Sequence, residues 1–220
     1  MFFRNFDLLE IILTLPAVLI ALTFHEFAHG YVSYKLGDPT AKNLGRLTLN
    51  PIKHIDPIGF ILMLVVGFGW AKPVPVNSRY YKKPRRDMAL VAAAGPVMNL
   101  LIAFVAMIFL NIVGIIPVYA ETTGYYVAYA SYLFFSNLAT LSVYLAVFNL
   151  IPIPPLDGSR ILYIFLPTKW YFGLMKYERY IMIGFYILLL FGSFSGVLGS
   201  ISGAILGGMN RIITLIPIFR

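Results

Sequence analysis

Residues 8–36, LLEIILTLPAVLIALTFHEFAHGYVSYKL, decide the fold class of this protein. The stretch is long enough to cross a bilayer, because a spanning helix needs about 20 apolar residues. It is interrupted by Pro16 and by one polar group, which consists of His25, Glu26 and His29. No small-residue cleavage site follows the opening residues MFFRNF, so we expect a retained membrane helix and not a cleaved signal peptide.

The composition of the whole chain indicates the same environment. Of its 220 residues, 60% are hydrophobic and only 12% are charged, and the mean hydropathy is +0.82. A soluble domain carries roughly a quarter charged residues. Because no polar stretch is long enough for a separate soluble module, we expect residues 1–220 to form a single all-α, multi-pass membrane domain.

The remaining chain brings the expected helical bundle to about five or six apolar segments. The predicted spans are Met88–Pro117, Gly124–Leu150 and Tyr180–Leu198, followed by an apolar, Gly-rich stretch at Ile201–Phe219. Ile58–Trp70 is too short to span, and its continuation AKPVPVN predicts a re-entrant or edge-hairpin element that is sheltered by protein. We also expect a short strand at Arg46–Leu49 and a short amphipathic piece that ends near Tyr177.

The basic residues predict the orientation in the bilayer. The formal net charge is +8, and Lys and Arg concentrate in Lys35–Arg86 and in Arg160–Arg179, beside apolar segments. This placement favours anionic lipid headgroups as partners over nucleic acid. Two predicted spans separate the two zones, so both lie on one face, which the positive-inside rule makes cytoplasmic. We therefore expect a cell-membrane protein with His25 and Asp157 near its cytoplasmic side.

Side chains that bind metals are few in this chain. There is no cysteine, and the histidines are His25, His29 and His54. Residues four apart on a helix share one face, so His25 and His29 can reach one zinc ion, and Glu26 is placed to take a proton from water at that metal. The alternative is a histidine pair that hydrogen-bonds to neighbouring helices. Burying such groups in a membrane is costly unless they serve a function, which favours the metal site.

Asp157 is the candidate for a third ligand. A catalytic zinc site has three protein ligands and one open position. Asp157 lies in IPIPPLDG, residues 151–158, whose three prolines prevent a regular helix and can aim a side chain into a cavity. The alternative is that Asp157 caps a helix starting near Ser159. Asp157 is expected at the same depth in the membrane as His25 and His29, and this match favours a metal ligand over a helix cap.

Four motifs in this order, HEFAHG, GWAKPVPVN, AAAGPVMNL and NLIPIPPLDG, resemble the site-2 protease family of intramembrane zinc metalloproteases. The resemblance extends over about residues 22–162. Within the family, the chain resembles the compact prokaryotic branch, whose members have no PDZ-like insertion and no CBS pair. It implies one Zn²⁺ per chain, held by the two histidines of HExxH and the aspartate of LDG, which are His25, His29 and Asp157. It implies that Glu26 is the general base. It also implies that Asn149 stabilises the oxyanion or holds substrate, the alternative being a hydrogen bond between helices.

The activity implied by the resemblance is hydrolysis of peptide bonds within or near transmembrane segments of other membrane proteins. The motif GWAKPVPVN offers an extended edge against which an unwound substrate can add as a strand. A metal permease and a catalytically inactive membrane chaperone are the alternatives. Paired repeats typical of transporters are not found, and the intact Glu26 argues against the chaperone. His54 is expected to be an interfacial or loop-ordering residue, the alternative being a fourth metal ligand, because catalytic zinc sites usually keep that position open. Asn99 is expected to be structural.

Overall fold

The computed structural model describes residues 8–66, 69–117, 119–190 and 195–219, and within these ranges it is helical with no strand. The long helices are α1 (Leu8–Lys35), α4 (Pro84–Gly114), α5 (Thr123–Asn149), α7 (Thr168–Leu190) and α8 (Ser195–Ile213). The short elements are α2 (Thr40–Asn43), η1 (Pro51–Lys53), α3 (Pro57–Val66), η2 (Ser78–Tyr80), α6 (Asp157–Leu162) and η3 (Pro217–Phe219). The predicted all-α class is confirmed.

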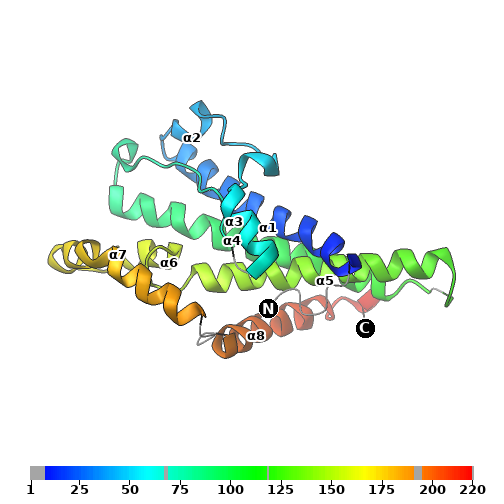
Figure 1. Cartoon of the computed structure of the whole chain (residues 1–220). Helices are drawn as coiled ribbons and strands as arrows, with labels where there is room; N and C mark the ends of the chain where they lie inside the picture. Colours follow the sequence, from blue (N-terminus) through cyan, green and yellow to red (C-terminus); the bar gives the residue numbers. More distant parts are fainter. Residues whose placement is uncertain (1–7, 67–68, 118, 191–194, 220) are drawn as a thin grey trace.

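Three long helices, α1, α4 and α5, pack against one another, and α8 packs on α5 (Figure 1). The contacts are made by small residues, because membrane helices approach closely where side chains are short. The buried alanines of this core are Ala17, Ala21, Ala103, Ala106, Ala139 and Ala146. Four helices, α1 from Ile12 onward, α4, α5 and α8, are long and apolar enough to cross a membrane. The protein is therefore a multi-pass membrane protein.

The short element expected at Ile58–Trp70 contains helix α3 and an irregular segment that we call the 69–77 segment. One antiparallel bridge, between Ile55 and Ala71, gives the element its only strand-like pairing within the described residues. The short strand expected at Arg46–Leu49 is wrong, because Leu47 and Thr48 form bends and the residues on either side of them have no regular structure. The Arg46 guanidinium instead donates to the carbonyl oxygens of Lys72 and Pro73, at 2.8 and 3.2 Å.

The C-terminal helix boundaries differ from the prediction. The amphipathic piece ending near Tyr177 and the first part of the span predicted at Tyr180–Leu198 form one helix, α7. The last apolar stretch begins earlier than predicted, at Ser195. The prediction placed a boundary where charged residues lower the hydropathy, but charges do not end a helix as proline does. Residues 191–194, which separate the two helices, lie outside the described residues.

The connection between α5 and α6 brings two distant parts of the chain together. After Asn149 the chain turns through three prolines and re-enters a helix at Asp157. A side chain at Gly158 would run into the carbonyl oxygens of Leu150 and Ile151, so the turn is tight enough to require glycine. Helix α6 packs on α4, and Asp157 thereby faces α1.

Candidate metal centre and active-site cleft

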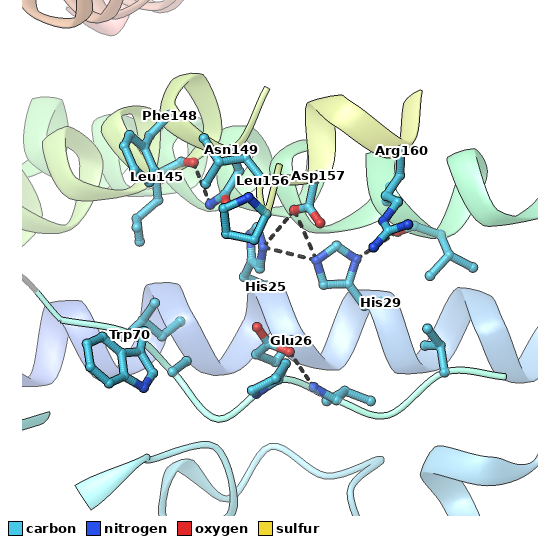
Figure 2. A pocket seen from close by; sticks show the side chains of 18 of the residues that line it. His25, Glu26, His29, Trp70, Leu145, Phe148, Asn149, Leu156, Asp157 and Arg160 are labelled. Carbon is cyan, nitrogen blue, oxygen red and sulfur yellow. Dashed lines mark hydrogen bonds and ion pairs between the residues drawn. The ribbon is translucent and has the colours of Figure 1, made fainter. Parts of the chain in front are cut away.

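His25, His29 and Asp157 meet at one point between α1 and α6 (Figure 2). The Nε2 atoms of the two imidazoles are 3.0 Å apart, and each is 3.2 Å from Oδ2 of Asp157. Both histidines are buried, and the Asp157 side chain keeps 21% of its surface exposed. One carboxylate oxygen of Asp157 therefore faces both imidazoles.

The three atoms fit a zinc ion. Zinc binds nitrogen and oxygen ligands at about 2.0–2.2 Å in a tetrahedron, which places neighbouring ligand atoms about 3.3 Å apart. The observed separations of 3.0 and 3.2 Å lie close to that value. A set of two imidazoles and one carboxylate is typical of catalytic zinc, with the fourth position left for water. Asp157 does not cap α6 with its side chain; it is the first residue of that helix, after Leu156.

Helix α4 forms the floor of the centre. Nδ1 of His29 lies 2.7 Å from the carbonyl oxygen of Val91, and Nδ1 of His25 lies 3.2 Å from Nδ2 of Asn99. A Cβ at Gly95 would lie 2.5 Å from His29 Nε2 and 2.7 Å from His25 Nε2. Only glycine leaves room for the two rings at this point of the helix.

Glu26 points away from the two histidines, toward the 69–77 segment (Figure 2). Its Oε2 accepts a hydrogen bond from the backbone amide of Val74, at 2.7 Å. The segment is also held near its middle, where Arg46 binds two of its carbonyl groups, and at its last residue, where the Asn77 amide donates to Asp38 at 2.7 Å. These contacts fix the segment along α1 beside the metal centre.

A cleft of about 450 Å³ connects these groups. It is lined by His25, Glu26, His29 and Asp157, by the 69–77 segment, and by Asn149 at the end of α5. Nδ2 of Asn149 donates to the Leu145 carbonyl in its own helix, at 2.9 Å. An amide nitrogen carries two protons, so one N–H of Asn149 remains for a group in the cleft.

His54 lies outside the metal centre. It is buried, and its Nε2 is 2.8 Å from the carbonyl oxygen of Thr48. Its own carbonyl oxygen accepts from the amide of Lys72. His54 therefore joins the loop after α2 to the 69–77 segment, which agrees with the loop-ordering role expected from the sequence.

Two residues of the site were missed by reasoning from sequence. Gly95 was quoted only within a motif, although glycine four residues before a polar Asn99 in an apolar helix signals a close approach on that face. Arg160, whose Nη2 is 3.4 Å from Glu178 Oε1, lines the cleft, and its signal was a cation two residues after LDG. The side chain of Asn99, which was expected to be structural, contacts the candidate ligand His25.

The fold and the centre together define a multi-pass membrane protein with three side chains that could hold a metal ion, in an arrangement typical of metallohydrolases. The profile of Peptidase family M50 matches residues 13–116 and 109–192. The chain belongs to this family, which contains the site-2 proteases, and it is a zinc metalloprotease.

Named relatives agree with the family. The chain is 46% identical over 176 residues to the "Putative zinc metalloprotease YwhC" of Bacillus subtilis, an alignment that covers 79% of this chain and 78% of the relative. It is 29% identical over 192 residues to the "Putative zinc metalloprotease MJ0611" of Methanocaldococcus jannaschii, covering 86% of each chain. No solved structure matches the chain significantly.

Proposed function

We propose that this zinc metalloprotease hydrolyses peptide bonds within or near the transmembrane segments of other membrane proteins. The observation that carries the proposal is the position of the candidate ligands on a helix that is long and apolar enough to span. His29 and His25 precede Lys35 by six and ten residues, which at 1.5 Å per residue is about 9 and 15 Å along the axis. The hydrocarbon core is about 30 Å thick, so this depth corresponds to between a third and a half of the core.

Helix α4 supports the same depth. Gly95 follows Pro84, the first residue of α4, by eleven residues, or about 16 Å. That end of α4 carries Arg85 and Arg86, as the corresponding end of α1 carries Lys35. Both distances support a centre that lies below a basic face, and the positive-inside rule would assign this face to the cytoplasm. The proposed location is the cell membrane, with the active site toward its cytoplasmic side.

In the proposed mechanism, His25, His29 and Asp157 would hold one Zn²⁺ per chain. The bound ion would supply Lewis acidity, which lowers the pKa of water and polarises a carbonyl group. Glu26 takes the proton from the attacking water and returns it to the leaving amine. The Val74 amide holds one oxygen of Glu26, so the other oxygen is free for the proton. Asn149 donates its second N–H to the developing oxyanion.

The substrate has to unwind before cleavage, because the backbone of a helix is shielded. The 69–77 segment lines the cleft, and its Pro73 and Pro75 keep it irregular. We propose that the unwound substrate lies along this segment, between it and the metal centre. From the sequence, Gly67 is also expected to favour an irregular backbone here, but it lies outside the described residues.

The test uses the full chain in lipid vesicles together with single-pass membrane proteins of varied transmembrane sequence. Mass spectrometry of the products locates the cleaved bond. Cleavage inside the hydrophobic segment by the wild type, lost in Glu26→Gln while zinc remains bound, supports the proposal. Cleavage that persists in Glu26→Gln would contradict the role of Glu26 as general base. Cleavage confined to soluble peptides would contradict transmembrane segments as the substrate.

Metal content tests the ligands separately. We expect about one zinc per chain in the wild type and its loss in His29→Ala and Asp157→Ala, because each removes one of three protein ligands. Unchanged zinc in Asp157→Ala would remove that residue from the ligand set. Zinc transport across the same vesicles, in place of proteolysis, would favour a permease.

A further inference from the structure

The two candidate histidine ligands are each tied to α4 through their second ring nitrogen. For His29 the partner of Nδ1 is a backbone carbonyl oxygen, that of Val91. For His25 the partner of Nδ1 is a side chain, the amide of Asn99. Asn99 has no exposed surface. Helix α4 therefore fixes the orientation of both imidazoles, but only for His25 does a replaceable side chain do so.

The chemistry of a ligand imidazole determines what Asn99 has to provide. A neutral imidazole binds a metal through one nitrogen and carries its proton on the other, which donates to an outer acceptor. Nε2 of His25 faces the centre, at 3.2 Å from Asp157 Oδ2, so with a metal ion bound to Nε2 the proton of the neutral ring would be on Nδ1. The Val91 carbonyl is such an acceptor for His29. His25 needs an acceptor as well.

The amide of Asn99 can supply that acceptor after a half-turn. As placed, its donor Nδ2 faces Nδ1 of His25, and its Oδ1 is buried without a hydrogen-bond partner among the described residues. Amide oxygen and nitrogen have nearly the same shape, so a rotation of 180° about the Cβ–Cγ bond exchanges them without moving any neighbour. The exchange gives the Nδ1 proton of His25 an acceptor and gives Oδ1 a partner, and it moves Nδ2 to the place that Oδ1 leaves.

We propose that Asn99 is a positioning residue of the metal centre: its amide oxygen accepts the Nδ1 proton of His25 and holds the ring with Nε2 toward the zinc ion. The proposal rests on the proposed function of His25 as a ligand. Neighbouring positions on this face of α4 offer no substitute, because the residue one turn earlier is Gly95, which has no side chain. Without Asn99, the Nδ1 proton of His25 would be buried without an acceptor, and the ring would be free to turn.

Two variants separate an acceptor from mere packing. Asn99→Asp keeps an acceptor at the same place and loses the donor, whereas Asn99→Leu keeps the size and loses both. A buried leucine would satisfy a structural requirement in an apolar helix better than a buried carboxylate. A structural role therefore predicts that the leucine variant is the better one, and the positioning role predicts the opposite order.

The experiment measures the zinc dissociation constant of the detergent-purified full chain by competition with a chromophoric chelator, and the visible absorption of the Co²⁺ form. Loss of an outer hydrogen bond to a ligand costs about 10–100-fold in metal affinity, so we expect this loss in Asn99→Leu together with an altered Co²⁺ spectrum. In Asn99→Asp we expect an affinity within about threefold of the wild type and a wild-type spectrum, because a carboxylate is a common acceptor for a ligand histidine.

The matched control is Asn111→Leu in the same helix. Nδ2 of Asn111 donates to Met107 and Asn210, away from the centre, so its loss should leave zinc affinity unchanged. Wild-type affinity in Asn99→Leu would overturn the proposal, as would a loss in Asn99→Asp equal to or greater than that in Asn99→Leu. If Asn99→Leu does not fold, Asn99→Asp decides alone, and any loss beyond about threefold overturns the proposal. His25→Ala tests the ligand role of His25 separately from the positioning role of Asn99. If His25→Ala retains zinc, His25 is not a ligand. If His25→Ala loses zinc but Asn99→Leu binds zinc like the wild type, only the positioning role of Asn99 is refuted.

Discussion

Replacing Gly95 by alanine tests the metal centre without touching any ligand. The added methyl group would lie 2.5 Å from His29 Nε2, 2.6 Å from His25 Cε1 and 2.7 Å from His25 Nε2, whereas ordinary contacts begin at 3.4 Å. The rings or the helix would have to move by about 0.7–0.9 Å. Metal–ligand distances tolerate only about 0.2 Å. We therefore expect at least one imidazole to leave the metal.

The expected loss of zinc affinity is at least about 100-fold, or about 2.8 kcal/mol, since it should exceed the effect of removing an outer hydrogen bond. The assay is zinc content after dialysis together with chelator competition on the detergent-purified protein. Thermal unfolding of the zinc-free form shows whether the helices still pack. Gly203→Ala is the control, because a Cβ there meets nothing within 4 Å and alanine favours a helix over glycine. Full zinc occupancy and wild-type affinity in Gly95→Ala would refute the placement of α4 against the two rings.

Three other substitutions test the contacts around the centre. Val74→Pro removes the amide that donates to Glu26, a bond to a charged group worth about 1.5–3 kcal/mol, so we expect about a tenfold or larger fall in kcat with zinc content unchanged. Val74→Ala keeps the amide and should stay close to wild type, and equal rates in the two variants would contradict the role of the amide. Gly158→Ala places a methyl group against backbone carbonyls, so it should lose zinc as Asp157→Ala does, as measured by metal analysis. Burial raises the pKa of the Asp38 carboxyl, but hydrogen bonds from Thr40, Asn77 and Ser33 outweigh burial and lower the pKa. The ionised carboxylate therefore stabilises the folded protein fully above the unfolded pKa of about 3.9, and this stabilisation is lost as pH falls through the lower pKa of the folded state. Asp38→Asn should therefore lower Tm most at neutral pH, by an amount equivalent to about 1–3 kcal/mol, with a difference from wild type that shrinks in acid; a pH-independent difference would contradict the role of the charge.

The fold class could be predicted because it depends on hydropathy and length. The apolar runs that become α1, α4 and α5 are long, and hydrocarbon accepts them only as helices with every backbone group paired. The boundaries of α7 and α8 could not be predicted in the same way. Charged residues near Tyr177 interrupt the hydropathy but not the helix, and the position of a helix end depends on the neighbours it packs against.

The candidate ligands were predictable to different degrees. His25 and His29 belong to one helical turn, so local geometry places both on one face. Asp157 is more than a hundred residues away, and its pairing with them depended on expected depth and on the resemblance to a family. In the structure, Oδ2 of Asp157 lies 3.2 Å from both Nε2 atoms, so the three side chains do meet.

The sequence by itself determined that this chain is a multi-pass helical membrane protein with an HExxH pair on its first long helix, because these properties follow from hydropathy and from the helical repeat. Only the tertiary structure decided which side chains surround that pair. The packing of α4 on α1 places Gly95 under the two rings and the Asn99 amide against His25. The packing of the 69–77 segment places the Val74 amide on Glu26. These contacts join residues more than forty positions apart, and their geometry depends on how closely whole helices approach, which no local pattern specifies.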